Sequence, residues 1–198
     1  MLKIEMIFKN HGGYACLRDL KEAGVHTDTI RENLRYGIIE KIKPGLYKWV
    51  DMPQFTEQSL ISACLAMPQA VICLHSALSY YELTMTLPSE IMIALPFGFK
   101  PTKFFYPPVL VFHFKDQLYS LGATTIATDN GSFRVYDTEK TIIDCFRFRR
   151  KLGLDVAMEG LKEYLRRSDA NINKLTQYAQ KARIYAVVMH YIEAIIVK

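Results

Sequence analysis

The sequence predicts an α+β protein built from a small N-terminal domain and a larger C-terminal domain. Short helical patterns separated by glycines precede a hairpin pattern near the N-terminus, and β-branched strands alternate with helices after it. Half of the 198 residues are hydrophobic and 23% are charged, which is typical of a folded globular chain. We therefore expect one domain at residues 1–52 and a mixed α/β domain at residues 53–198 that ends in a helical segment.

The N-terminal domain is expected to start with two helices joined by a brief extended piece. Residues 2–11 place Ile4, Ile7 and Phe8 at helical spacing, and the glycines that follow end this helix. Residues 14–15 can extend, and residues 17–23 are expected to form the short second helix. Gly24 then occupies a tight turn, where a positive φ angle favours glycine.

A third helix is expected from Thr27, whose hydroxyl group can accept a hydrogen bond from the first turn as an N-cap. Ile30 and Leu34 fall on one face of this helix and can be buried together. The charged residues lie on the opposite face or its flank: Asp28, Arg31, Glu32 and Arg35. Gly37 is expected to end the helix.

A two-stranded hairpin is expected after this helix. Residues 38–43 alternate apolar and polar side chains as a half-buried strand does, Pro44 and Gly45 make the turn, and residues 46–50 return. This order of elements is typical of a winged helix-turn-helix, in which the third helix reads DNA and the hairpin is the wing. An ordinary surface helix and hairpin of a small α/β domain is the alternative that this stretch leaves open.

The C-terminal domain is expected to begin after Met52 and Pro53. Its expected helices are 57–67, 75–83, 137–149, 154–167, 172–181 and 184–197, and its expected strands are 70–74, 90–95, 109–114, 123–127 and 132–136. Asp137 can cap the helix that follows it. Residues 58–81 contain no charged side chain, but Pro68 interrupts them, so we expect no membrane span.

The charge of the chain indicates what kind of partner it can bind, and its cysteines indicate whether it has disulfides or a metal site. The net charge of +5 favours a polyanionic partner without requiring one. Before Met52, nine Lys and Arg oppose seven Asp and Glu, and the hairpin holds the local excess of lysine. The four cysteines have no CxxC spacing and lie among apolar neighbours, which predicts buried reduced thiols in a cytoplasmic protein. We expect no secretory signal, no cofactor and no metal site.

No enzyme is expected, because the usual motifs of enzymes are missing from the sequence. It contains no glycine-rich phosphate loop, no GxSxG elbow and no HExxH motif. His75 and Ser76 are neighbours in a helix and do not form a dyad, so we expect local capping roles for both. One enzymatic alternative stays open, a Mg²⁺-dependent nuclease that uses clustered carboxylates and a lysine. Those residues are Asp129, Asp137, Glu139, Lys140 and Asp144.

Two basic runs in the C-terminal domain close consecutive helices. They comprise Arg147, Arg149, Arg150, Lys151, Arg166 and Arg167. Cations in a last turn complement the helix dipole, but four cations within five residues exceed that need. We expect either a secondary contact with phosphate or a protein partner, or a solvated face.

Several short motifs together make the chain similar to a known family. In the N-terminal part they are Gly13-Tyr14-Ala15, Leu20-Lys21-Glu22-Ala23-Gly24-Val25 and Lys43-Pro44-Gly45-Leu46-Tyr47. In the C-terminal part they are Leu74-His75-Ser76-Ala77-Leu78, Glu82-Leu83-Thr84, Ile93-Ala94-Leu95-Pro96, Asp137-Thr138-Glu139-Lys140-Thr141-Ile142-Ile143-Asp144-Cys145-Phe146-Arg147 and Lys151-Leu152-Gly153-Leu154-Asp155. With these motifs over nearly its whole length, the chain resembles the AbiEi family, the antitoxins of bacterial abortive-infection (type IV) toxin–antitoxin systems.

The resemblance implies an N-terminal DNA-binding domain that represses its own operon, by binding operator DNA with inverted repeats upstream of it. It also implies a C-terminal domain that counteracts a nucleotidyltransferase-like toxin without a stable complex, as part of phage resistance. This chain departs from many relatives at Cys16, where they have Ser or Thr, and at Asp28 and Glu32, where they have more arginine. A third class of function, a protein-binding adaptor that uses the C-terminal helices, stays open.

The residues expected to contact DNA lie on the third helix and on the hairpin. Arginine can read guanine, threonine can contact phosphate or a thymine methyl group, and lysine can hold the DNA backbone. These residues are Thr27, Thr29, Arg31 and Arg35 on the helix, and Lys41, Lys43, Tyr47 and Lys48 on the hairpin. Because the helix is nearly neutral, we expect the hairpin, and Lys43 in particular, to be the stronger contact.

Overall fold

The computed structural model describes residues 3–51, 57–101 and 107–196, and in these residues the protein is a mixed α+β fold with eleven helices and two sheets. This architecture confirms the predicted α+β class. The chain divides into two compact units. The first unit contains Met1–Pro68, Lys100–Pro108 and Ile126–Phe133, and the second contains Gln69–Phe99, Val109–Thr125 and Arg134–Lys198. The domain boundary expected at residues 52 and 53 lies outside the described residues and stays a prediction.

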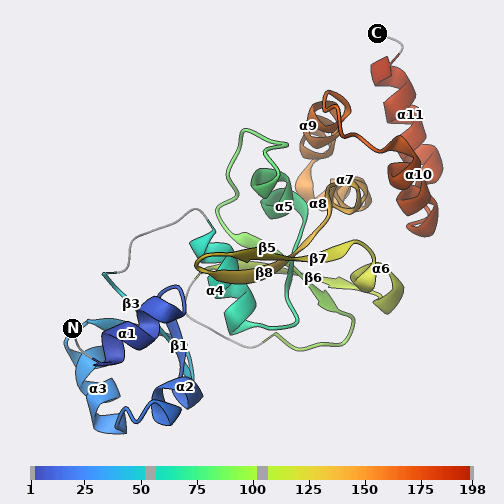
Figure 1. The fold of residues 1–198 in the computed structure, drawn as a ribbon. Coiled ribbons are helices and arrows are strands. Elements are labelled where there is room, and N and C mark those ends of the chain that lie inside the picture. The colour runs from blue at the N-terminus through green and yellow to red at the C-terminus, as the bar shows by residue number, and fades with distance from the viewer. Residues whose placement is uncertain (1–2, 52–56, 102–106, 197–198) are drawn as a thin grey trace. The chain divides into compact units, whose positions relative to one another are not determined.

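The first unit begins with helices and strands in the predicted order (Figure 1). The elements are α1 (Lys3–Asn10), β1 (Tyr14–Cys16), α2 (Leu17–Glu22), α3 (Thr27–Arg35), β2 (Ile39–Lys43), β3 (Leu46–Trp49) and α4 (Gln58–Ala66). Strand β3 is central in an antiparallel sheet of order β1-β3-β2. The hairpin that follows α3 is therefore completed into a three-stranded sheet by the short strand between the first two helices.

One small apolar core holds these elements together. It joins buried side chains from all three helices and all three strands of residues 3–49: Ile4, Phe8, Ala15, Leu20, Ile30, Ile39, Tyr47 and Trp49. The rings of Phe8 and Trp49 lie 5.5 Å apart between their centroids. Removing such side chains from water is the main favourable contribution to folding, and here it fixes the position of α3 against the sheet.

The turns on either side of α3 explain its length. Gly24 has a φ angle of +77°, as the predicted tight turn requires. Gly37 follows the helix with a φ angle of +68°, and the amide of Ile38 donates to the carbonyl of Asn33 at 2.9 Å. This contact satisfies a backbone carbonyl at the end of the helix, where the intrahelical partners are missing.

Three predictions about this region are wrong in detail. Thr27 is the first helical residue and His26 is the N-cap, which makes no side-chain capping bond and whose carbonyl accepts from the amide of Ile30 at 3.2 Å. Cys16 is exposed at the N-cap of α2, whereas Cys64, Cys73 and Cys145 are buried free thiols as expected. The alternation expected over residues 38–43 fails, since a register shift between Lys41 and Lys43 leaves Glu40 and Lys41 both exposed.

The second unit is organised around a five-stranded mixed sheet of order β6-β5-β4-β8-β7. Its strands are β4 (Val71–Ile72), β5 (Ile91–Pro96), β6 (Val109–Phe114), β7 (Ala123–Thr128) and β8 (Gly131–Tyr136), with residues 126–133 of the last hairpin grouped with the first unit. Strands β5 and β6 run parallel, β4 is antiparallel to β5, and β4 is parallel to β8. The predicted strands therefore all form, although the first is only two residues long.

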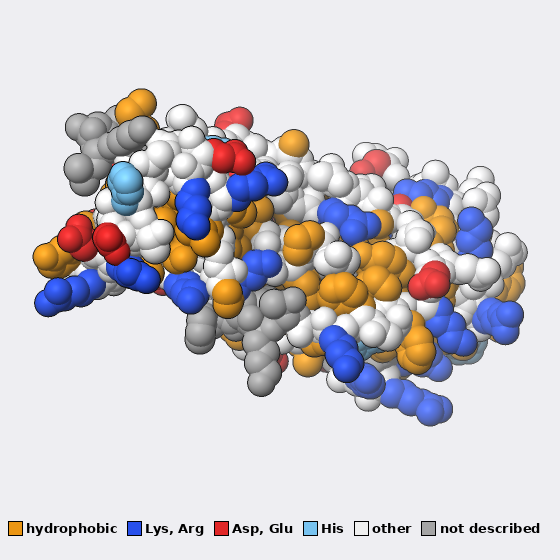
Figure 2. Space-filling model, turned by 90° about the horizontal axis from the view of Figure 1, so that it is seen from below, with side chains coloured by type: hydrophobic (Ala, Val, Ile, Leu, Met, Phe, Trp, Pro, Cys, Tyr) orange, Lys and Arg blue, Asp and Glu red, His pale blue; other side chains and the backbone are white. Residues whose placement is uncertain are grey.

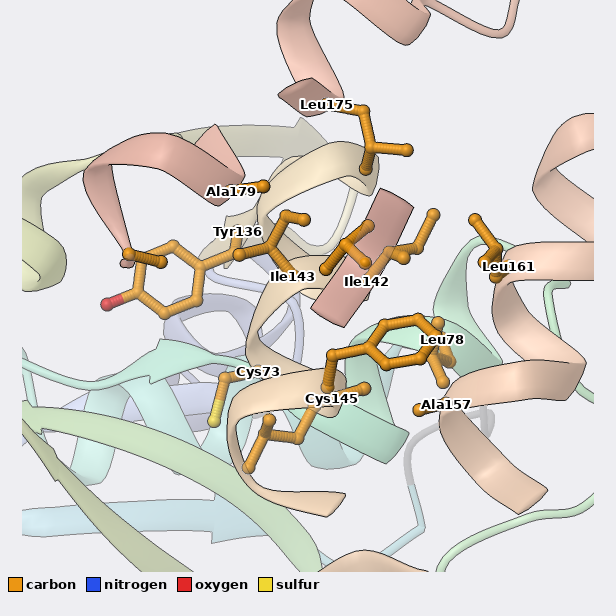
Figure 3. Close-up of a cluster of buried hydrophobic side chains, with 14 of the residues drawn as sticks. Cys73, Leu78, Tyr136, Ile142, Ile143, Cys145, Ala157, Leu161, Leu175 and Ala179 are labelled. Atoms are coloured by element: carbon orange, nitrogen blue, oxygen red, sulfur yellow. The ribbon is translucent and has the colours of Figure 1, made fainter. Parts of the chain in front are cut away.

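The described part of this unit contains seven helices, and most of the others pack against α7. They are α5 (Leu74–Tyr80), α6 (Asp116–Ser120), α7 (Thr138–Arg147), α8 (Arg149–Leu152), α9 (Leu154–Leu165), α10 (Ile172–Lys181) and α11 (Tyr185–Ile196). In Figure 1, α5, α7, α9, α10 and α11 lie on one side of the sheet. Figure 3 shows Ile142 and Ile143 of α7 among apolar side chains from α5, α9 and α10. Helix α7 is the buried centre of this layer, because eight of its residues are shielded from solvent.

The sequence missed two short helices of the second unit. Helix α6 was not predicted, and the helix expected at 137–149 ends at Arg147, with α8 beginning after Phe148. Phe148 leaves the helix so that its ring packs 5.1 Å from Phe112 and 5.4 Å from Phe114. Asp137 caps α7 as predicted, since its side chain accepts from the amide of Lys140. In the described parts of the chain, no helix has the length and apolar character needed to cross a membrane.

Candidate nucleic-acid interface

Helix α3 presents a polar face to solvent. Ile30 is buried in the core of residues 3–49 and Leu34 packs against it, which turns the opposite side of the helix outward. Of the predicted contacts on α3, Thr27, Arg31 and Arg35 are exposed and Thr29 is half-buried. All four side chains therefore lie on one helix and are at least partly accessible to solvent, as the amphipathic spacing of α3 predicted.

The charges on this face almost cancel. The Nη1 atom of Arg31 lies 3.0 Å from the Oδ1 atom of Asp28, and the two side chains are 74% and 86% exposed. Glu32 and Arg35 are also exposed, and within residues 3–51, 57–101 and 107–196 neither forms an ion pair. Two cations and two anions therefore share the outer face of α3.

The hairpin offers less exposed positive charge than its sequence indicated. Lys41 is exposed, and it forms no ion pair or hydrogen bond with the described residues. The Nζ atom of Lys43 instead donates to the carbonyl of Ala66, at the end of α4, at 2.7 Å. Tyr47 is 8% exposed in the core, and Lys48, with its side chain 14% exposed, lies 3.4 Å from Glu40. Of the four predicted hairpin contacts, Lys41 is thus the most accessible.

Three further exposed residues near α3 were not predicted. Tyr36 is 72% exposed directly after the helix. Arg18 and Lys21 are exposed on α2, where the Nε atom of Arg18 lies 3.7 Å from Asp19 and 3.8 Å from Glu22. The exposure of Tyr36 could have been predicted from the sequence, because this residue lies outside the apolar stripe of Ile30 and Leu34 and directly before Gly37, which ends the helix. Its ring and hydroxyl group can contact a sugar-phosphate backbone.

The two basic runs of the second unit are largely occupied by internal contacts. Arg147 pairs with the buried Asp144 at 3.2 Å, and Arg149 donates to the carbonyl of Phe146 at 2.8 Å. Arg166 pairs with Glu163, and Arg167 makes two bonds of 2.9 Å to Asp169. Arg150 and Lys151 remain exposed, with the Nζ atom of Lys151 6.0 Å from the Phe112 ring. On the face that Figure 2 shows, Lys and Arg side chains are spread among apolar ones rather than gathered in one patch.

Three of the four carboxylates considered for a nuclease, all except Asp129, pair with lysines around α7. Lys140 and Asp144 form an ion pair with neither side chain exposed, and burial raises the pKa of Asp144, an effect that the Lys140 ammonium partly offsets. Lys174 bridges Asp137 at 3.1 Å and Glu139 at 2.9 Å. Burial raises the pKa of Glu139, but the hydrogen bonds from Lys174 and Tyr164 outweigh it and bring that pKa below its ordinary value.

His75 and Ser76, the other two residues considered for a catalytic role, also form hydrogen bonds within the protein. The Nε2 atom of His75 lies 2.9 Å from the Thr86 hydroxyl, and the Ser76 hydroxyl accepts from the amide of Met92 at 2.8 Å. Among the residues that the structure describes, no group of three His, Cys, Asp or Glu side chains could hold a metal ion. The chemistry that these arrangements support is hydrogen bonding and charge pairing.

Comparison of the sequence with known protein families and with curated proteins identifies no relative of the chain. No model of a known protein family matches the sequence, and no curated protein matches it.

Proposed function

We propose that residues 3–49 form a winged helix-turn-helix that binds double-stranded DNA, with α3 as the recognition helix and the β2–β3 hairpin as the wing. The observation that carries this proposal is the solvent-exposed polar face of α3, whose Ile30 is buried in the core that the helix shares with a sheet of order β1-β3-β2. A helix placed in the major groove needs such a face, and a neighbouring strand pair can reach the adjacent backbone.

Individual residues have different roles in this interface. Arg35 is exposed and not engaged by a carboxylate of the described residues, so it can bind the O6 and N7 atoms of guanine. Thr27 lies at the start of α3, where its hydroxyl group and the helix dipole favour a phosphate. Lys41 on the hairpin and Tyr36 after the helix suit the DNA backbone.

The cellular role that fits this interface is that of a cytoplasmic transcriptional autorepressor and antitoxin of a type IV toxin–antitoxin operon, active in abortive infection. The support is the likeness of the motifs around Gly13, Lys43 and Asp137 to the AbiEi family. The operator would carry inverted repeats upstream of the operon, and the second unit would counteract a nucleotidyltransferase-like toxin without a stable complex.

The DNA-binding proposal is tested with the full chain and the DNA upstream of its own gene. Fluorescence anisotropy should give tighter binding to this DNA than to a shuffled duplex, by a factor of roughly 10³ or more. Arg35→Ala should reduce that preference, whereas Lys162→Ala, which removes another exposed cation, on α9, should not. Equal affinity for both duplexes, or no binding, would contradict the proposal.

The antitoxin proposal is tested separately by co-expression with the toxin-like gene beside it. Growth should be restored both by the wild-type chain and by Arg35→Ala, because the second unit is unchanged. Size-exclusion chromatography of the two proteins should show no common peak. A stoichiometric complex that survives high salt would support a protein-binding adaptor instead, and failure to restore growth would contradict the antitoxin role.

A further inference from the structure

The Asp28–Arg31 pair is unusual for a surface that binds DNA. Asp28 stands in the first turn of α3, the part of a recognition helix that contacts base edges. A carboxylate there repels phosphate and lowers the affinity for DNA of any sequence. The ion pair itself adds little to folding stability, because an exposed pair such as this one contributes about 0–1 kcal/mol.

The position of the pair offers a different explanation. Asp28 and Arg31 are three residues apart on the exposed side of the helix, with the Asp28 Oδ1 atom 3.0 Å from the Arg31 Nη1 atom. An aspartate in the major groove can accept from the N4 amino group of cytosine, and an arginine can donate to the O6 and N7 atoms of guanine. Together the two side chains carry the hydrogen-bonding groups that complement a C·G pair or two adjacent pairs.

We infer that Asp28 is a specificity-determining residue, which holds the Arg31 guanidinium in place and makes DNA binding depend on a cytosine amino group beside it. The inference rests on the proposed DNA-binding function. On a duplex with the wrong base, the Asp28 carboxylate faces acceptor atoms or phosphate and loses water without gaining a bond. Asp28 therefore weakens binding to most sequences more than it weakens binding to the operator.

The test compares Asp28→Asn with a matched control. Glu22→Gln removes one carboxylate of an exposed pair with Arg18 on α2, 3.8 Å apart, so it changes the net charge equally. Binding of each full-length variant to the upstream DNA and to a shuffled duplex is measured over a range of salt concentrations. Thermal melting of each variant confirms that it is folded.

For Asp28→Asn, affinity for the shuffled duplex should rise, and the ratio of specific to non-specific affinity should fall by at least about fivefold, the lower limit for one base contact. Selection from random DNA should yield, for the wild-type chain, a C·G preference that disappears in Asp28→Asn. Glu22→Gln should leave the ratio and the selected sequence unchanged.

A ratio that stays within about twofold of the wild-type value, or that falls equally in Glu22→Gln, would overturn the inference while leaving the DNA-binding proposal standing. An unchanged selected sequence for Asp28→Asn would do the same. If the wild-type chain itself binds no DNA, both the proposed function and this inference are overturned.

Discussion

On α3 of the first unit, Asp28 and Arg31 form an ion pair whose side chains are 86% and 74% exposed, while on α7 of the second unit Lys140 and Asp144 form one in which neither side chain is exposed. In each pair the two residues are about one helical turn apart, at spacing i,i+3 on α3 and i,i+4 on α7. Water screens the first pair, so either member can exchange its partner for DNA at little cost. In the second pair, the Lys140 ammonium lies over the rings of the core residues Phe114 and Tyr136, where an unpaired charge is expensive.

In the proposed function, oppositely charged side chains serve recognition on α3, whereas around α7 they pair in the interior of the second unit. Around α7, the charges of Asp137, Glu139 and Lys174 are also tied to each other and to the hydroxyl groups of Tyr164 and Tyr178. Burial, rather than the spacing of charges along the sequence, separates the two roles. Substitutions that remove one charge at a time therefore test whether burial separates the two pairs.

The largest effect is expected for Asp144→Leu. It leaves the Lys140 ammonium buried without its partner, and removing one member of a buried pair costs about 3–5 kcal/mol in the free energy of unfolding. Urea denaturation measures this loss. The control Asp28→Asn should change the free energy of unfolding by less than about 1 kcal/mol. A loss below about 1 kcal/mol for Asp144→Leu would mean that the two pairs do not differ as their burial indicates.

A smaller effect that depends on pH is expected for Glu139→Gln. The pKa of Glu139 is lowered in the folded state, so its ionised form favours folding. At pH 7 the variant should be less stable by about 1–3 kcal/mol, the contribution of hydrogen bonds to a charged group. This difference is complete above the unfolded pKa of about 4.5 and disappears as pH falls through the lower folded pKa. Urea denaturation between pH 7 and pH 3 measures it, and a difference that stays constant with pH would contradict the assignment.

On the hairpin, Lys41→Ala and Lys43→Ala should have opposite signatures. Lys41→Ala should lower DNA affinity and flatten its salt dependence by about one ion, and should change unfolding by less than about 0.5 kcal/mol. Lys43→Ala should instead cost about 1 kcal/mol in unfolding, because it removes the hydrogen bond to the Ala66 carbonyl. Anisotropy titrations and urea denaturation separate the two. If Lys43→Ala alone flattens the salt dependence, Lys43 is the phosphate contact, as the sequence indicated.

Local spacing was enough to predict most helices and strands, and the outward face of α3. Ile30 and Leu34 are four residues apart, and that spacing alone turned Asp28 and Arg35 to solvent. The engagement of Lys43 could not be predicted, since its partner Ala66 lies 23 residues further along the chain. The register shift beside Lys41 depends on pairing with β3, so the consecutive polar residues Glu40 and Lys41 did not predict it by themselves. Burial of Lys140 likewise depends on helices that pack on α7 from distant positions in the sequence.

The smallest effect is expected for Arg166→Ala in the second unit. Arg166 is exposed and already paired with Glu163 three residues before it, so the surface loses little net attraction for phosphate when this cation is removed. The free energy of unfolding should change by less than about 0.5 kcal/mol. The salt dependence of DNA binding should also stay as in the wild-type chain, in contrast to Lys41→Ala. A flattening of about one ion would mean that Arg166 leaves Glu163 to bind phosphate, and the second unit would then share in DNA recognition.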